Sequence, residues 1–151
     1  MSYLLACEAS DVFKAIAPVA GMILQSIYDT CAPPNPMPVF EIHGTEDYVT
    51  YWEGDMNNED GWGAYPDMRT MIDFWVDLNG LELSETTDIE DTNTNDGSNV
   101  VFERYWSSST MNEVWFYKVM GGGHDWPGAE GNMDIDSSTD MWMFFSKYLE
   151  D

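Results

Sequence analysis

The chain has 151 residues, of which 44% are hydrophobic and 15% aromatic, and its 28 acidic residues stand against only five basic ones. This length and apolar content are enough for one domain with its own core, residues 1–151, and exclude a disordered chain. The formal net charge of −23 repels phosphate backbones and anionic lipid headgroups, so we expect neither nucleic acid nor a membrane as a partner.

The residue pattern also argues against a membrane span and a targeting segment. No stretch approaches the roughly 18–20 unbroken apolar residues of a spanning helix, and the first residues lack the basic-then-apolar layout of a signal peptide. The acidic composition suits a solvated surface in a saline or cold habitat, and affinity for cations is the alternative. No internal repeat or linker divides the chain.

Two apolar runs in the first third of the chain are predicted to be buried strands. After a short helix over residues 2–9, the run at residues 15–21 ends in glycine. A second run at residues 38–44 follows a proline-rich turn at residues 31–36. Short continuous apolar runs of this kind are typical of strands that are buried on both faces of a parallel sheet.

The rest of the chain predicts two helices and two further strands. Residues 66–80 have the three- and four-residue apolar spacing of an amphipathic helix that ends in glycine. The apolar positions of that helix are Met68, Met71, Ile72, Trp75 and Leu78. Residues 82–96 carry acidic side chains without a basic one and indicate an exposed excursion, whereas residues 100–105 and 114–119 indicate strands. A last helix over about residues 138–148 is expected to pack Met141, Trp142, Phe144, Phe145 and Tyr148.

Strands that alternate with helices predict an α/β fold with a small, mainly parallel sheet and helices on both faces. In such sheets the chemistry gathers in loops at the carboxyl ends of the strands. Two loops qualify, at residues 43–50 and 121–128, and they contain Asp47 and His124. An aspartate after one strand can orient and charge-stabilise a histidine after a later strand, and Asp before His is the chain order of the α/β-hydrolases.

The serine that such enzymes need is missing from its usual setting. The α/β-hydrolases place it in a G-x-S-x-G pentapeptide on a strand-to-helix turn, and no such pentapeptide occurs in the 151 residues. Ser107, Ser108 and Ser109 follow a predicted strand, while Ser2 and Ser10 flank the first helix, and none has an elbow-like context. The nucleophile is therefore not identified from the sequence.

Four stretches, in chain order, read SYLLACEASDVFKAIAPVAG, CAPPNPMPVFEIHGTEDYVTYWEG, DTNTNDGSNVVFERYW and GGGHDWPG. Their specific parts are the His-Gly-Thr-x-Asp loop and the Gly-Gly-Gly-His-x-Trp-Pro-Gly loop. Together they resemble the carboxyl-terminal half of secreted polyhydroxybutyrate depolymerase and feruloyl esterase-like α/β-hydrolases, over essentially the whole chain. The resemblance implies a truncated three-layer α/β-hydrolase-type sandwich and a carboxylic-ester hydrolase for short-chain hydroxyalkanoate or aromatic esters.

By the same resemblance, Asp47 is the triad acid, His124 is the triad base, and the protein is exported. We expect no cofactor and no metal. Trp126 and His43 are the candidate substrate-binding residues. For Trp126, the lining of an acyl or aromatic pocket and the covering of the core both remain open, and His43 is better explained as a packed or oxyanion-loop residue than as a catalyst.

In the family the nucleophile elbow lies just before the helix that contains SYLLACE, and the present chain begins inside that helix. Three explanations follow: a missing amino-terminal half completes the site, a new serine acts in the chain alone or in a homo-oligomer, or the module has kept the fold for binding or oligomerisation and lost the chemistry. Without the earlier strands, residues 15–21 become an unpaired edge, and we expect association through it with a second copy or with the missing half.

The two cysteines and the possible metal sites remain to be interpreted. Cys7 and Cys31 form either one disulfide in an oxidising compartment or two buried thiols. Residues 91–97 resemble the start of a calcium loop, but their glycine is seventh and Glu103 thirteenth, against sixth and twelfth in an EF-hand, which favours an Asx-rich turn. Two histidines and no paired cysteines give little support for zinc.

Overall fold

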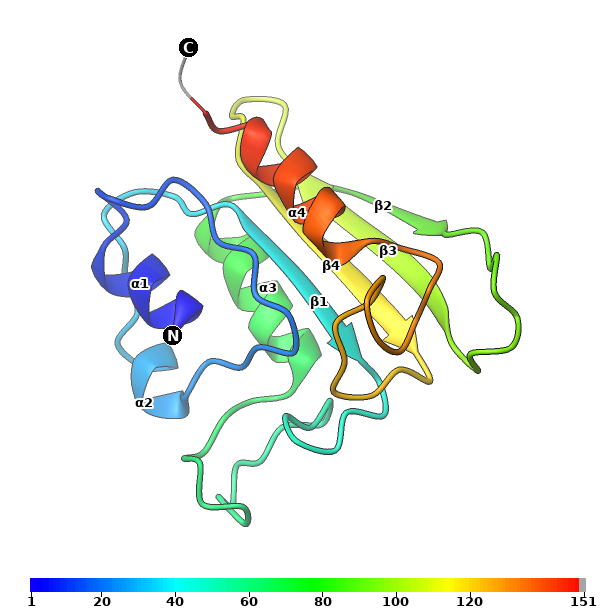
Figure 1. Cartoon of the computed structure of the whole chain (residues 1–151). Helices are drawn as coiled ribbons and strands as arrows, with labels where there is room; N and C mark the ends of the chain where they lie inside the picture. The colour runs from blue at the N-terminus through cyan, green and yellow to red at the C-terminus, as the bar shows by residue number, and fades with distance from the viewer. Residues whose placement is uncertain (150–151) are drawn as a thin grey trace.

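The computed structural model describes residues 1–149 and contains four helices and four strands. In chain order they are α1 (Ser2–Glu8), α2 (Gln25–Tyr28), β1 (Val39–Gly44), α3 (Met68–Leu78), β2 (Leu83–Asp88), β3 (Asn99–Trp106), β4 (Glu113–Met120) and α4 (Ser137–Ser146). The strands form one sheet in the order β1-β4-β3-β2, with α3 behind it and α4 across its front (Figure 1). The α/β class and the helices on both faces of the sheet are therefore confirmed.

The expectation of a mainly parallel sheet is wrong. Only β1 and β4 pair in parallel, whereas β4 with β3 and β3 with β2 are antiparallel. A parallel pair needs a crossover of about a dozen residues or more, usually a helix. No helix lies in the connections at residues 89–98 and 107–112, so β2, β3 and β4 turn back on one another as neighbours.

The predicted strand at residues 15–21 is only partly formed. Isolated parallel bridges link Ile16 to Val39 and Val19 to Ile42, so the segment runs beside β1 without becoming a regular strand. Pro18 has no N–H to donate, and Ala20 has a φ of 50°, which lies outside the β region. The Ile42 N–H still donates to the Pro18 carbonyl and the Ala20 N–H to the Ile42 carbonyl, so the pairing around Val19 remains a single bridge.

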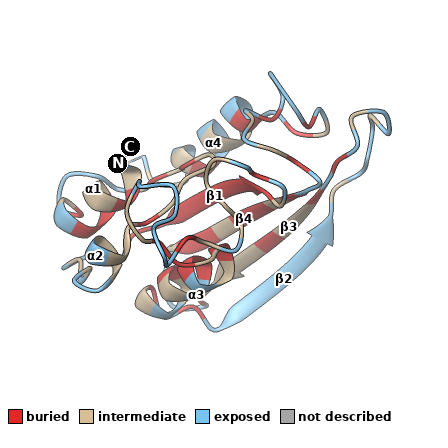
Figure 2. Cartoon of the chain, turned by 90° about the horizontal axis from the view of Figure 1, so that it is seen from below, coloured by how far each residue is buried: buried red, intermediate tan, exposed pale blue. Residues whose placement is uncertain are grey.

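The two faces of β1 pack against different helices. All six residues of β1 are buried (Figure 2). Phe40 and Ile42 join a cluster with Phe144 of α4, and Val39 joins the cluster that holds Trp75 of α3. Because side chains alternate along a strand, Glu41 and His43 lie on the same face as Val39, under α1 and α3.

Two predictions outside the core need correction. The expected exposure of residues 82–96 is confirmed for residues 83–88 (Figure 2), but these residues form the edge strand β2. Backbone pairing with β3 holds this strand, so it lacks the apolar alternation on which a sequence prediction depends. Trp142 of α4 is 63% exposed and does not pack in the core, whereas Phe144 is fully buried.

A disulfide joins Cys7 at the end of α1 to Cys31 in the turn that leads to β1. This decides between the two alternatives for the cysteines. The closed loop spans 24 residues of separation, and cross-linking a loop of that size stabilises a fold by about 3 kcal/mol in the chain-entropy model. The disulfide therefore ties α1 to the turn that precedes β1. Among residues 1–149, no helix is long and apolar enough to cross a membrane.

Candidate catalytic pair at the carboxyl end of β1 and β4

The two loops singled out in the sequence meet at one edge of the sheet. Because β1 and β4 are parallel neighbours, Gly44 and Val119 lie side by side in the register and the loops after them leave at the same end. The loops are then tied together by hydrogen bonds. The Glu46 N–H donates to the Gly122 carbonyl at 2.9 Å, and the Gly121 N–H donates to Thr45 Oγ1 at 2.9 Å.

Gly44 allows the two loops to approach each other this closely. A Cβ atom at position 44 would overlap the carbonyl oxygens of both Gly122 and Gly123. A residue with a side chain at this position forces the second loop away from the first. The glycine in the His-Gly-Thr motif is therefore required by the close approach of two backbones.

We expect Gly44→Ala to displace the loop at residues 121–123 and to separate His124 from the first loop. Forced overpacking of this kind costs about 1–3 kcal/mol of unfolding free energy. The measurements are denaturant unfolding and the NMR shifts of the His124 imidazole, which are readily assigned because the chain has two histidines. Gly80→Ala is the control, because Gly80 has positive φ but open space around it. It should lose stability without moving the His124 signal, and an unmoved signal in Gly44→Ala would contradict the expectation.

Asp47 is a buried carboxylate held by its own loop. It is 4% exposed, its Oδ1 accepts the N–H groups of Val49 and Thr50 at 2.8 Å each, and its Oδ2 accepts the Thr50 hydroxyl at 3.0 Å. Burial alone raises the pKa of Asp47, but the two backbone N–H groups and the contact with His124 outweigh it and hold the pKa below its usual value. Asp47 is therefore ionised at neutral pH.

His124 presents one nitrogen to Asp47 and leaves the other available. Nδ1 lies 2.9 Å from Asp47 Oδ2 and 3.1 Å from Oδ1, and the side chain is 36% exposed. An ionised carboxylate only accepts, so Nδ1 carries the proton and Nε2 keeps its lone pair. Among residues 1–149, no hydrogen bond engages Nε2. This is the tautomer that a general base requires.

His43 lies beneath this pair rather than beside it. It is 1% exposed, with Nε2 at 2.8 Å from the Thr50 carbonyl and at 3.6 Å from Asp47 Oδ2, and Nδ1 at 3.1 Å from Glu41 Oε1. Both nitrogens are occupied and no ring atom reaches solvent. The geometry therefore supports the packed role and gives no support to direct contact between His43 and a substrate.

The polar network below the site continues to α1. Glu41 is fully buried and accepts the Tyr3 hydroxyl at 2.5 Å and the Gly21 N–H at 3.0 Å. Burial raises the pKa of Glu41. Burial alone would lower the pKa of His43, but its hydrogen bond and charge interaction with Glu41 outweigh burial, so the pKa of His43 is raised. His43 Nδ1 and Glu41 Oε1 share one hydrogen bond. This network anchors Thr50, and through it the loop that carries Asp47.

A hollow opens directly beside His124. It has a volume of about 240 Å³ and is lined by Met22, Val49, Thr50, Trp62 and His124. Two larger hollows, of about 440 and 320 Å³, share Met22 with it and continue along residues 17–22 toward the start of α1. We call these three hollows the edge groove.

Trp126 lies on this groove and not in the core. It is 42% exposed, lines the groove together with Ser2 and Tyr3, and donates its indole N–H to Ser138 Oγ at 3.2 Å. This supports the pocket-lining alternative for Trp126. Sequence reasoning missed Met22 and Trp62, although a tryptophan between two glycines, Gly61-Trp62-Gly63, indicates an exposed aromatic side chain on a turn.

The serine candidates do not complete a triad within the described residues. Ser107 binds Glu82 and Ser109 at the opposite end of the sheet, and Ser10 accepts the N–H of Asn35. Ser108 likewise binds Glu82. Ser2 alone among the five candidates lines the edge groove. In residues 1–149, no hydroxyl or thiol is hydrogen-bonded to Nε2 of His124, and both cysteines are in the disulfide.

The acidic turn that resembles a calcium loop is held by protein donors. Asp96 accepts the N–H groups of Ser98 and Met133, and Asp134 accepts those of Thr92 and Asn93. Within the described part of the chain, no group of three or more His, Cys, Asp or Glu side chains is arranged to hold a metal ion. These carboxylates close the turn onto residues 132–134.

Comparison with known proteins gives no family: the sequence matches no protein-family model and no curated protein. Function is therefore inferred from the geometry of the pair, the edge groove and the motifs.

Proposed function

We propose that the chain is a carboxylic-ester hydrolase with a truncated α/β-hydrolase-type fold, in which Asp47 and His124 are two members of a Ser-His-Asp triad. The observation that carries the proposal is the pair itself. A buried, ionised Asp47 holds Nδ1 of His124, and the free Nε2 belongs to a side chain that lines an apolar hollow. The resemblance of the two loop motifs to those of the depolymerase and feruloyl esterase-like hydrolases supports the same assignment.

In this mechanism His124 Nε2 accepts the proton of a serine hydroxyl as the oxygen attacks the ester carbonyl. Asp47 stabilises the imidazolium that forms, and the imidazolium then gives the proton to the leaving alkoxide. The acyl group stays on the serine until water, activated by the same nitrogen, releases it as a carboxylic acid. Short-chain hydroxyalkanoate or aromatic esters are the proposed substrates.

The nucleophile is proposed to come from a serine of this chain, a second copy or an amino-terminal partner. The test combines hydrolysis of p-nitrophenyl butyrate with labelling by a fluorophosphonate, read by intact mass and peptide mapping. We expect turnover together with a single labelled serine, which names the nucleophile. No turnover and no label from the purified chain, alone or with an amino-terminal half supplied, would contradict the proposal.

A second candidate, a catalytically silent module for oligomerisation or binding, is favoured by one observation. Ile16, Pro18 and Ala20 pair with β1, but among the described residues the N–H groups of Ala17 and Val19 donate to no backbone oxygen. An edge of this kind can accept a further strand from a second copy or from an amino-terminal partner. Sedimentation analysis tests it: a dimer without esterase turnover supports this candidate, and a monomer at all concentrations contradicts self-association.

The proposed location is extracytoplasmic. The Cys7–Cys31 disulfide supports it, because disulfides persist mainly in oxidising compartments.

A further inference from the structure

The hollow beside His124 is apolar in its side chains but acidic in its surroundings. Met22, Val49 and the 63% exposed Trp62 form most of its wall, together with Thr50 and His124. Methionine and tryptophan offer polarisable contact area and, in Trp62, a π face that attracts cations. Shape and lining therefore suit the apolar part of a small molecule.

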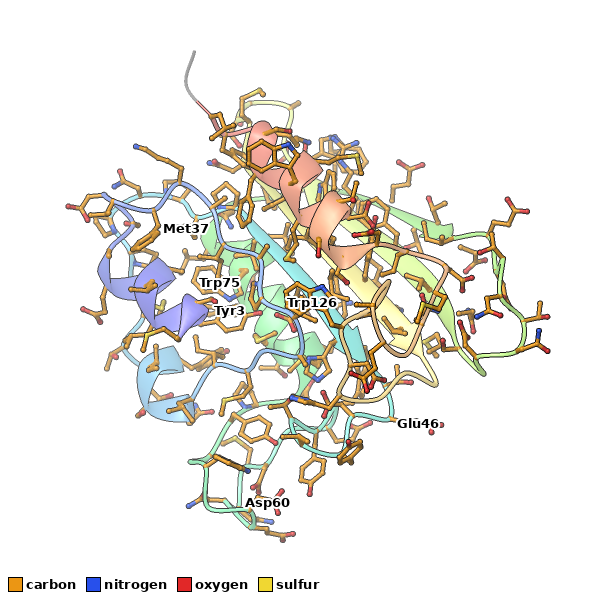
Figure 3. The ribbon with its side chains drawn as sticks, in the orientation of Figure 1. Tyr3, Met37, Glu46, Asp60, Trp75 and Trp126 are labelled. Carbon is orange, nitrogen blue, oxygen red and sulfur yellow. A yellow bond between two sulfur atoms is a disulfide. The ribbon has the colours of Figure 1, made fainter. Side chains whose placement is uncertain are left out.

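The loops around this hollow contain carboxylates and no Lys or Arg. Residues 46–63, which include Trp62, carry six acidic residues and no Lys or Arg: Glu46, Asp47, Glu53, Asp55, Glu59 and Asp60. Residues 121–132, which include His124, add Asp125 and Glu130. Glu46 and Asp60 lie on the same side of the molecule, beyond the end of β1 (Figure 3).

The basic side chains of the protein are placed elsewhere. Arg69 and Lys118 pair with Glu103, and Arg104 and Lys147 pair with Glu113, all on the β3–β4 part of the molecule. The fifth, Lys14, lines a separate hollow with Phe13, Asn35 and Tyr148. Among the described residues, no Lys or Arg lines the hollow at His124. The local field at its mouth repels anions and attracts cations.

We propose that the His124–Trp62 hollow is a binding subsite for the apolar group of a small, positively charged molecule, and that it discriminates against molecules that carry a carboxylate. As a statement about substrate class, the proposed subsite rests on the proposed function, but binding to the hollow needs no nucleophile. In an esterase the same field would also speed release of the carboxylate product.

The test uses three amides that share a butyryl group and are not esters: butyranilide, its para-trimethylammonium derivative and its para-carboxylate derivative. Binding is followed by NMR shifts of the His124 imidazole and the Trp62 indole in 20 mM salt. We expect the cation to bind about 3–10-fold more tightly than the neutral amide, and the anion more weakly than both. The differences should shrink in 0.5 M salt, where the screening length is only a few ångströms.

Two variants separate this subsite from unspecific adsorption. Trp62→Ala should weaken binding of all three amides about 5-fold or more, whereas Trp142→Ala, which removes a tryptophan of equal exposure on α4, should change none. Equal losses in both variants, or affinities that ignore ligand charge, would overturn the proposal. Cation preference without ester turnover keeps the subsite and rejects the hydrolase. Turnover of the three corresponding esters at equal kcat/KM keeps the hydrolase and rejects the charge selection.

Discussion

His124→Ala is expected to lower kcat/KM for p-nitrophenyl butyrate by about 10³–10⁴-fold, because it removes the imidazole that Asp47 orients and that the proposed mechanism uses as the base. Asp47→Asn should cost about as much, for a different reason. The amide oxygen introduced by this substitution would keep the N–H groups of Val49 and Thr50, so the new amide N–H would face His124. Nδ1 must then accept that N–H, the proton moves to Nε2, and the base is lost.

Glu46→Gln is the matched control for Asp47→Asn. Glu46 is the adjacent residue in the same loop, is exposed, and loses the same charge without touching His124. For the neutral ester, the kcat/KM of Glu46→Gln should stay within about 2-fold of that of the starting protein. A solvent-exposed charge is screened by water and contributes little to the energy of a nearby site. Full activity in His124→Ala would show that a different group acts as base and would remove the pair from the mechanism.

Glu113→Gln is expected to have the largest effect on stability, about 2–3 kcal/mol at pH 7, because the charges it pairs are partly buried. Glu113 receives Arg104 through two N–H groups at 2.7 and 2.9 Å and Lys147 at 2.6 Å. It also accepts the indole N–H of Trp115. Removing the carboxylate leaves two cations with no partner at this position.

The effect should depend on pH in a defined direction. Burial raises the pKa of Glu113, but hydrogen bonds from Arg104 and Lys147 dominate and lower it to about 2, against an ordinary value of 4.5. A carboxyl whose pKa is lower in the folded state stabilises the fold above its unfolded pKa and loses that contribution as it becomes protonated in both states. The difference between Glu113→Gln and the starting protein should therefore be constant above about pH 5.5 and shrink between pH 4.5 and 2.

Urea unfolding at pH 7, 4 and 2.5 measures this difference. Glu90→Gln is the control, because Glu90 is exposed and its loss only reduces the net charge of −23. It should change the unfolding free energy by less than about 0.5 kcal/mol. If the deficit of Glu113→Gln were the same at pH 2.5 as at pH 7, the ion pairs would not be its source.

Local sequence patterns were sufficient to predict several helices and strands. The three- and four-residue apolar spacing at residues 66–80 predicted α3, observed at Met68–Leu78. The apolar run at residues 38–44 predicted β1, and the alternating pattern at residues 114–119 predicted β4. In each case the signal is a periodicity or an apolar run within the residues of a single helix or strand. The edge strand β2 has no buried face, so no such signal exists for it.

The candidate site was predictable in its members but not in its arrangement. Asp47 and His124 were found because both follow buried strands, and the structure brings them within 2.9 Å of each other. His43 shared the first loop motif, yet the pleat of β1 turns it to the buried face beside Glu41. Met22 and Trp62 lie in irregular segments without periodicity, and only the folded chain places them at His124.

The sequence by itself determined the net charge, the helices α1 and α3, the strands β1, β3 and β4, and the two loops in which the chemistry is sought. The tertiary structure decided the strand directions, the Cys7–Cys31 bond, the close approach of the loops at Gly44 and the residues that line the edge groove. Periodicity reflects forces within one segment of chain. Contacts between residues tens of positions apart depend on how segments pack, and no local pattern records that packing.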